Sequence, residues 1–132
     1  MISIDPRSSI PIYEQIIENT KDAILKNLIS PGEKLPSIRE MASILLTNPN
    51  TVSKAYSELE RQNIIETLRG KGTYICENVI GKLKEEKMQA LVENLKSVIQ
   101  EAKSLEFTEE KLCSLIKDMY KGLGGEESHD RN

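Results

Sequence analysis

The sequence predicts a mostly α-helical fold with a small β-hairpin, in which an N-terminal winged helix-turn-helix is followed by a two-helix C-terminal segment. Three features indicate this fold: a Ser-x-x-Glu capping pattern at Ser37–Glu40, a second helix start at Asn48-Pro49, and two β-branched runs around residues 68–72. Two short helices in close succession are typical of a helix-turn-helix. They can also occur as plain three-helix packing, so the hairpin is what favours the winged form.

Length and composition indicate a small helix-rich protein. At 132 residues the chain has room for one domain with an appendage, since domains typically hold about 100–150 residues. Its 38% hydrophobic and 30% charged residues are typical of a soluble folded chain, not a disordered one. No apolar run approaches the roughly 20 residues of a membrane span, and the N-terminus lacks a signal peptide's apolar region. We therefore expect a cytoplasmic protein with no membrane contact.

Signals for metal binding, nucleotide binding and catalysis are weak. Cys76 and Cys113 lie far apart in the sequence without other metal ligands beside them, which indicates free thiols and no metal site. The run from Gly70 to Thr73 lacks the GxxxxGK[ST] spacing of a phosphate-binding loop. His129, the one histidine, falls near the C-terminus, away from any nucleophile pattern. We expect no enzyme activity and no cofactor.

The N-terminal part predicts an arm followed by the first helix. Pro6 and Pro11 disfavour helix in the residues before them, so residues 1–10 are predicted to be extended. From Pro11 onward an apolar face recurs at helical spacing, and Ser30-Pro31-Gly32 is predicted to end the helix. Residues 33–36 are predicted to extend along the hairpin. The apolar face consists of Ile12, Ile16, Ile17, Ala23, Ile24 and Leu28.

The next two helices form the predicted helix-turn-helix. The first starts at Ser37 and has its apolar stripe at Ile38, Met41, Ala42 and Leu45. The second is capped by Asn48, with Pro49 at its first position. Its buried stripe, Val52, Ala55, Tyr56 and Leu59, leaves a polar face that lacks the apolar anchors of a protein-binding helix. That face consists of Asn50, Thr51, Ser53, Lys54 and Ser57.

The hairpin predicts a basic wing. Ile64–Thr67 and Thr73–Cys76 are the two strand-forming runs, and the glycines between them permit a tight tip. Arg69 and Lys71, with the exposed amides of Gly70 and Gly72, suit phosphate or minor-groove contact. A plain hairpin turn would need neither charge.

After Cys76 the sequence predicts two further helices. Apolar residues from Val79 to Leu105 recur at spacings of three, four and seven, which indicates one long helix. Thr108 can cap a second helix, with Glu109 and Glu110 in its first turn, and this helix is predicted to end near Gly122. We therefore divide the chain into a winged helix-turn-helix at residues 10–77, a two-helix segment at 78–123 and a disordered tail at 124–132.

The two C-terminal helices carry more apolar surface than they can bury on each other, which predicts pairing with a second copy of the chain. The alternative is that this stripe packs back on its own winged helix. The predicted dimerisation residues are Leu83, Leu91, Leu95, Val98, Ile99, Leu112, Leu115, Ile116 and Met119.

Charge is unevenly distributed along the chain. The formal net charge is −3, which argues against coating of nucleic acid by bulk charge. Residues 34–76 hold six basic residues against four acidic ones, a local charge of +2, so the rest of the chain carries −5. A small positive face on an acidic molecule favours a limited, specific DNA contact.

Several motifs in the same order and spacing resemble the DNA-binding domain of the GntR family of bacterial transcription regulators. They are the opening Pro11–Ile16, then Leu35–Ala42, Asn48–Val52 and Arg69–Thr73. The NPNTV variant and the short tail are similar to the YtrA subfamily, which implies a dimeric repressor, often of an operon encoding an ABC transporter. Many family members carry arginine where this chain has Pro49 and Ser53, so guanine recognition by those arginines is not implied here.

These observations together predict a sequence-specific, dimeric DNA-binding transcription regulator, a repressor on a pseudo-palindromic double-stranded operator. The alternative is a winged-helix module that binds proteins without specific DNA binding. The segment after Cys76 is too short for a separate effector domain, so any effector is unknown and would bind weakly or between subunits. The predicted DNA-binding residues are Lys34, Ser37, Arg39, Asn48, Asn50, Thr51, Ser53, Lys54, Arg69, Gly70, Lys71 and Gly72.

Overall fold

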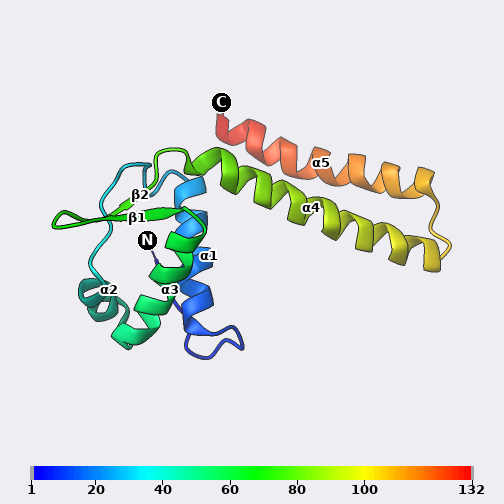
Figure 1. Ribbon diagram of the computed structural model, residues 1–132. Helices are drawn as coiled ribbons and strands as arrows, with labels where there is room; N and C mark the ends of the chain where they lie inside the picture. Colours follow the sequence, from blue (N-terminus) through cyan, green and yellow to red (C-terminus); the bar gives the residue numbers. More distant parts are fainter. Residues whose placement is uncertain (1, 132) are drawn as a thin grey trace. The chain divides into compact units, whose positions relative to one another are not determined.

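The structure is a computed structural model that describes residues 2–131, with side chains described for residues 2–123. The elements in chain order are α1 (Ile12–Leu25), α2 (Ile38–Leu45), α3 (Pro49–Arg61), β1 (Ile65–Leu68), β2 (Gly72–Ile75), α4 (Val79–Ser104) and α5 (Glu109–Arg131) (Figure 1). They form two compact units, Met1–Lys87 and Met88–Asn132, which we call the winged unit and the C-terminal unit. Helices, a two-stranded wing and two C-terminal helices confirm the predicted fold class.

The starts of α2 and α3 confirm the predicted caps. The backbone N–H of Glu40 donates to Ser37 Oγ at 3.1 Å, and the Ser37 N–H donates to Glu40 Oε1 at 3.0 Å. This reciprocal pair satisfies two N–H groups that a helix start would otherwise leave unpaired. At α3 the Asn50 N–H donates to Asn48 Oδ1 at 2.8 Å, and Pro49 occupies the first turn. Because both starts are fixed locally, the turn between α2 and α3 is fixed as well.

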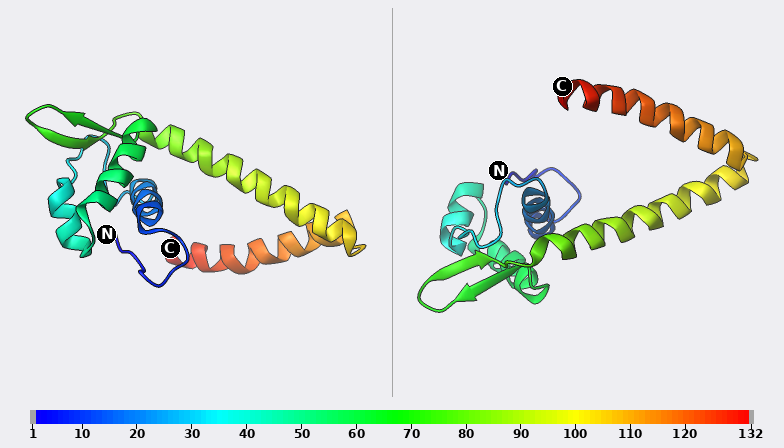
Figure 2. Two further views of the ribbon diagram at one scale, coloured as in Figure 1. Left: turned by 60° about the horizontal axis from the view of Figure 1, so that its bottom comes forward. Right: turned by 90° about the horizontal axis from the view of Figure 1, so that it is seen from above.

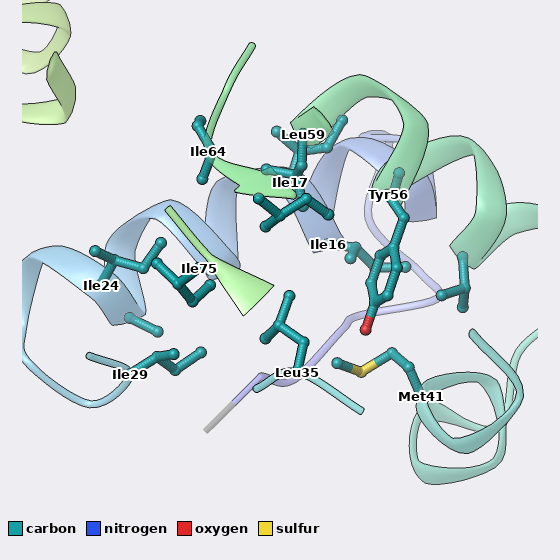
Figure 3. Packing of buried hydrophobic residues seen from close by; sticks show 14 of the residues in the cluster. Ile16, Ile17, Ile24, Ile29, Leu35, Met41, Tyr56, Leu59, Ile64 and Ile75 are labelled. Carbon is teal, nitrogen blue, oxygen red and sulfur yellow. The ribbon is translucent and has the colours of Figure 1, made fainter. Parts of the chain in front are cut away.

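The core of the winged unit lies between α1, α2, α3 and the hairpin. In Figure 3 the labelled side chains of α1 and α3 lie beside Leu35, Met41 and Ile75, and the Tyr56 ring closes one side. The Tyr56 hydroxyl donates to the Pro36 carbonyl at 2.7 Å, so this buried polar group is satisfied. Burial raises the pKa of Tyr56 to about 12.

One core assignment made from the sequence is wrong. Leu28 was expected on the buried face of the first helix, but α1 ends at Leu25 and Leu28 is 57% exposed. Asn27 adopts a positive φ of 61°, which ends the helical register, and Ile29 takes the buried place at 1% exposure. The end of the helix is therefore set by Asn27, earlier than Ser30-Pro31-Gly32.

The hairpin confirms the predicted wing. Its strands are antiparallel, with Ile65 opposite Ile75 and Leu68 opposite Gly72. The predicted extended segment before α2 runs along β2, because the Leu35 N–H donates to the Thr73 carbonyl at 2.8 Å and the Ile75 N–H donates to the Glu33 carbonyl at 2.9 Å. Residues 33–35, β2 and β1 therefore lie side by side, and the wing extends from this three-segment base.

The N-terminal arm is held against α1 by side chains of that helix. Gln15 accepts a hydrogen bond from the Asp5 N–H at 2.7 Å, and its Nε2 donates to the carbonyls of Asp5 and Ile10 at 2.9 and 2.8 Å. Ile2 and Ile4 pack against the edge of the core. Residues 2–5 contain no helix, strand or turn, but the expected extended conformation is wrong for residues 6–10, which form a turn and bends, with the Ser8 N–H donating to the Asp5 carbonyl at 3.2 Å.

The beginning of α4 belongs to the winged unit. Val79 and Leu83 are each 1% exposed within the same core. Ion pairs connect this end of α4 to α1, with Lys21 Nζ 3.6 Å from Glu86 Oε2 and Lys87 Nζ 3.0 Å from Asp22 Oδ1. The compact unit thus continues to Lys87, beyond the expected end at residue 77. Leu83 cannot serve as a dimerisation residue, because its own chain already buries it.

The C-terminal unit consists of the rest of α4 and α5. A turn joins them, in which Glu106 has a φ of 56° and the Phe107 N–H donates to the Ala102 carbonyl at 2.9 Å. Thr108 caps α5 as expected, accepting from the Lys111 N–H at 3.2 Å. Figure 2 shows that the two helices separate as they leave this turn. Ala102 is buried, but most of the larger apolar side chains of this unit remain exposed.

The backbone of α5 differs from the expected end near Gly122, since it stays helical to Arg131. No proline interrupts this stretch, and each glycine costs a helix only about 1 kcal/mol relative to alanine. The disordered tail expected at residues 124–132 stays a prediction, because the side chains of residues 124–131 and all of Asn132 lie outside the described residues.

Candidate nucleic-acid interface

The N-terminal end of α3 presents a polar surface. Asn50 and Lys54 are exposed, while Thr51 and Ser53 are half-buried on the same helix. No hydrogen bond among the described residues uses the Asn50 side-chain amide, so its donor and its acceptor are both free for a base edge. The opposite face of α3 is anchored by Val52, Ala55, Tyr56 and Leu59 in the core. The core thus fixes which side chains of α3 face outward.

Asn48 and Ser37 each cap the start of a helix. Their side-chain oxygens accept from the first turns of α3 and α2. The hydrogen bonds from Ser37 also hold the pKa of Glu40 below its usual range. A DNA contact by either residue stays a prediction, and it would have to use the remaining hydrogen-bonding capacity of each side chain.

Lys54 lies over the ring of Tyr13 from α1. Its Nζ is 3.9 Å from the ring centroid, which is within the range of a cation–π interaction. The two residues line a shallow hollow of about 460 Å³ together with Pro11, Ile12, Asn50 and Thr51. The hollow joins the first turns of α1 and α3, so Tyr13 belongs to the same surface as the predicted contact residues.

Farther along α3, charges are paired with each other. Arg61 Nε and Nη2 donate to the Glu58 carboxylate at 2.9 and 2.5 Å, and Gln62 Nε2 donates at 2.8 Å. The hydrogen bond from Arg61 is the main reason that the pKa of Glu58 falls to about 2. Since Glu58 is engaged by these two residues, it does not neutralise Lys54. In the described part of the chain, Lys54 forms no ion pair.

The wing gathers three cations. Arg69 and Lys71 are exposed at the tip, where the Lys71 N–H donates to the Leu68 carbonyl at 2.9 Å and closes the turn. Lys34 joins them because its side chain crosses Gly72. A Cβ built on Gly72 would lie 2.6 Å from Lys34 Cε, and φ there is +115°. The positive φ favours glycine at position 72, whereas the end of the flexible Lys34 side chain could move away from a Cβ.

Arg39 is exposed on α2 and forms no ion pair among the described residues. The structure places it on the winged unit, and no ion pair among the described residues joins it to the α3 surface or the wing. Its DNA contact stays a prediction, as do those of the other residues. Tyr13 is not among the predicted site residues, and the structure adds it to this surface through its contact with Lys54.

The apolar residues of the C-terminal unit are largely open. Leu91, Leu95, Val98, Leu115 and Met119 are between 45% and 59% exposed. Ile99 is 39% exposed, and Leu112 and Ile116 are half-buried. Since soluble chains seldom expose a continuous apolar stripe without a partner, this surface needs an explanation beyond the fold of one chain.

Comparisons with known proteins decide the family. The bacterial regulatory proteins of the gntR family match residues 12–75, which span α1 to the end of β2. The HTH-type transcriptional repressor YtrA of Bacillus subtilis (strain 168) is 54% identical over 130 residues, covering 98% of this chain and 100% of that protein. The chain belongs to the GntR family. The resemblance to the YtrA subfamily is confirmed by this identity along nearly the whole chain.

Solved structures agree with this GntR-family assignment. A transcriptional regulator from Oenococcus oeni aligns with a TM-score of 0.79 and 33% identity, covering 90% of this chain and 98% of that one. AraR(DBD) in complex with operator ORX1 aligns with a TM-score of 0.50 and 27% identity, covering 55% of this chain and 90% of that one. This GntR-family chain is therefore a DNA-binding regulator with the expected winged fold.

Two further findings bear on other classes of function. None of the helices in the described part of the chain is long and apolar enough to cross a bilayer. Within the same residues, no group of three or more His, Cys, Asp or Glu side chains is arranged to hold a metal ion.

Proposed function

We propose that this GntR-family regulator is a homodimeric repressor that binds a pseudo-palindromic operator through the α3 surface and the wing. The observation that carries the proposal is the set of uncommitted polar groups at the N-terminal end of α3, on the same compact unit as a basic wing. Polar side chains at the start of a recognition helix suit base edges, whereas clustered cations suit phosphates.

Base recognition is assigned to Asn50. Its amide can pair bidentately with adenine N6 and N7, and it lies in the first turn of α3, the end that usually meets base edges. Thr51 and Ser53 supply shorter hydroxyl contacts nearby. Arginine is absent from this part of α3, so we expect a preference for A·T over G·C at the position that Asn50 contacts.

Phosphate binding is assigned to the wing and to Arg39. Lys34, Arg69 and Lys71 provide positive charge beside glycines that permit close approach of the backbone. Each phosphate contact releases counterions, so binding should weaken steeply as the salt concentration rises. The overall charge of −3 limits this attraction to the local basic surface.

Dimerisation is assigned to the C-terminal unit. Its exposed apolar residues include Leu91, Leu95, Val98, Ile99, Leu115 and Met119. A second copy offers the same stripe, so one symmetric contact covers both. The dimer would deliver two α3 helices to successive major grooves about 34–36 Å apart, which requires a pseudo-palindromic operator.

Repression is inferred from the similar Bacillus subtilis protein, which is named a transcriptional repressor. A bound dimer can block transcription by occupying promoter DNA. The subfamily resemblance further suggests that the target is an operon encoding an ABC transporter. A reporter fused to the promoter of a candidate operon should be expressed more strongly when the gene for this chain is deleted.

The experiment that tests DNA recognition is selection of duplexes from a random-sequence pool with the full chain. We expect enrichment of two inverted half-sites and a steep fall in affinity with salt. Lys71→Ala should reduce the salt slope, and Lys84→Ala is its matched control, because Lys84 is an exposed lysine on α4 outside the α3 surface and the wing. If no sequence is enriched and the affinity for DNA does not change with salt concentration, the result would instead favour a protein-interaction module.

A further inference from the structure

We propose that Tyr13 is a positioning residue for DNA binding, whose ring holds the Lys54 ammonium at the N-terminal end of α3 so that it meets a backbone phosphate. The inference rests on the proposed function and deepens it, since it assigns a role within the same surface to a residue of α1. Tyr13 itself is not proposed to contact DNA.

The geometry places the cation against the ring face. Lys54 Nζ lies 3.9 Å from the Tyr13 centroid, within the roughly 6 Å over which a ring attracts an ammonium. Tyr13 is half-buried and packs against the core, whereas Lys54 is exposed. A fixed ring therefore restrains a flexible four-carbon side chain that would otherwise sample many rotamers.

The ring restrains the ammonium without neutralising it. A carboxylate partner would have cancelled the charge that a phosphate needs, and three glutamates line the adjoining groove between α1 and α3: Glu14, Glu18 and Glu58. Glu58 is occupied by Arg61 and Gln62, and Glu14 accepts from the Tyr13 hydroxyl at 3.2 Å. Among the described residues Lys54 forms no ion pair with any of these glutamates, so its ammonium lies on the aromatic ring without a carboxylate partner.

The restrained ammonium lies beside the base-recognition residues. The hollow that Tyr13 and Lys54 line also includes Asn50 and Thr51. A phosphate contact at this point would fix how deeply and in which register α3 enters the groove. Holding Lys54 in place before binding reduces the ordering cost at the moment of binding, which raises affinity without adding a contact.

The test compares Tyr13→Leu with Tyr13→Phe in the full chain. The probes are a duplex recovered from the random pool by the unmodified chain and a random-sequence duplex of equal length. Tyr13→Leu removes the ring face and should weaken binding to both duplexes about two- to five-fold per protomer. Tyr13→Phe keeps the face and should bind like the unmodified chain, although it loses the hydroxyl contact with Glu14.

Lys54→Met provides the coupling measurement, because it keeps an aliphatic side chain on the ring and removes the charge. It should reduce the salt slope by about one unit per protomer. In combination with Tyr13→Leu the loss should be no larger than for Lys54→Met alone, since both act through one contact. A merely structural role of Tyr13 would give additive losses.

A second measurement needs no DNA and guards against a variant that fails to fold. The ring current of Tyr13 should shift the ε-methylene protons of Lys54 upfield in the NMR spectrum of the full chain, and Tyr13→Phe should preserve this shift. Absence of the shift in the unmodified chain would overturn the inference, and so would additive losses in the double variant.

The outcomes separate this inference from the proposed function. If Lys54→Met leaves affinity and salt slope unchanged while Asn50→Ala weakens binding, the role of Tyr13 fails and operator recognition by α3 stands. If Asn50→Ala also has no effect on either duplex, the assignment of α3 as the recognition helix fails.

Discussion

The winged unit buries most of its large apolar side chains, whereas the C-terminal unit leaves most of its large apolar side chains exposed. Leu83, on the part of α4 that belongs to the winged unit, is 1% exposed, whereas Leu95, three turns later on the same helix, is 45% exposed. The winged unit surrounds its apolar residues with three helices and a hairpin, and the C-terminal unit has no element left to do so. One continuous helix thus begins in a core that its own chain covers and continues with apolar residues that are exposed.

The largest expected effect tests that partner. Leu95→Asp should disrupt the proposed dimer, because each protomer would bury a carboxylate without a partner, at a cost of about 3–5 kcal/mol each. Sedimentation of the full chain should then show a monomer at concentrations where the unmodified chain is a dimer. An undiminished dimer would place the contact elsewhere, and Asn94→Asp, at an exposed neighbouring position, controls for the added negative charge.

The second prediction changes Leu83, the buried leucine of the winged unit, in place of the exposed Leu95. Leu83→Ala removes a fully buried side chain and should destabilise the winged unit by about 2–5 kcal/mol, including the cavity that it leaves. Urea denaturation followed by circular dichroism measures this loss. Sedimentation below the denaturation transition should still show a dimer. A dissociated but stable Leu83→Ala protein would contradict the division of α4 into a core part and a dimer part.

The sequence was sufficient where a signal is local. The capping pair of Ser37 and Glu40, the Asn48-Pro49 start and the basic wing each depend on a few neighbouring residues, and all are present in the structure. Leu83 could not be assigned in this way. Leu83 and Leu95 belong to one series of apolar residues along α4, and the series alone does not show that the start of α4 packs into the core of the winged unit.

Other failures have the same origin. Leu28 continued the apolar periodicity of α1, but the positive φ of Asn27 had already ended the helix. The contact between Tyr13 and Lys54 could not be predicted from the sequence, because the two residues are distant along the chain and close only in space. Which residues contact DNA remains a prediction, since periodicity identifies an exposed face without identifying what binds there.

A smaller effect distinguishes base recognition by Asn50 from phosphate binding by Lys71 within the winged unit. Asn50→Ala should cost about 1–3 kcal/mol on the selected duplex and flatten the preference at one base pair per half-site, with little change on random DNA. Lys71→Ala should weaken both duplexes similarly and reduce the salt slope by about one unit per lost contact. Titrations at several salt concentrations distinguish them. If Asn50→Ala preserves base preference while Lys71→Ala changes it, sequence recognition lies in the wing.

The smallest expected effect concerns strain at a turn in each unit. Leu46, which ends α2, adopts φ 54° and ψ 47° and is 91% exposed. The left-handed conformation costs a side chain such as leucine about 1–2 kcal/mol, whereas asparagine tolerates it. Because the Leu46 side chain is almost entirely in solvent, its removal loses little packing. Leu46→Asn should therefore stabilise the winged unit by about 1 kcal/mol.

Glu106 provides the matched change in the C-terminal unit, since its φ is 56° in the turn between α4 and α5. Glu106→Asn should relieve strain there and leave the melting of the winged unit unchanged. Leu46→Asn also has a functional readout, because strained residues persist where something else requires them. Stabilisation with unchanged operator affinity would mean that Leu46 is only a tolerated helix end. Stabilisation with weaker binding would show that this exposed leucine, in the turn that leads into α3, takes part in binding DNA.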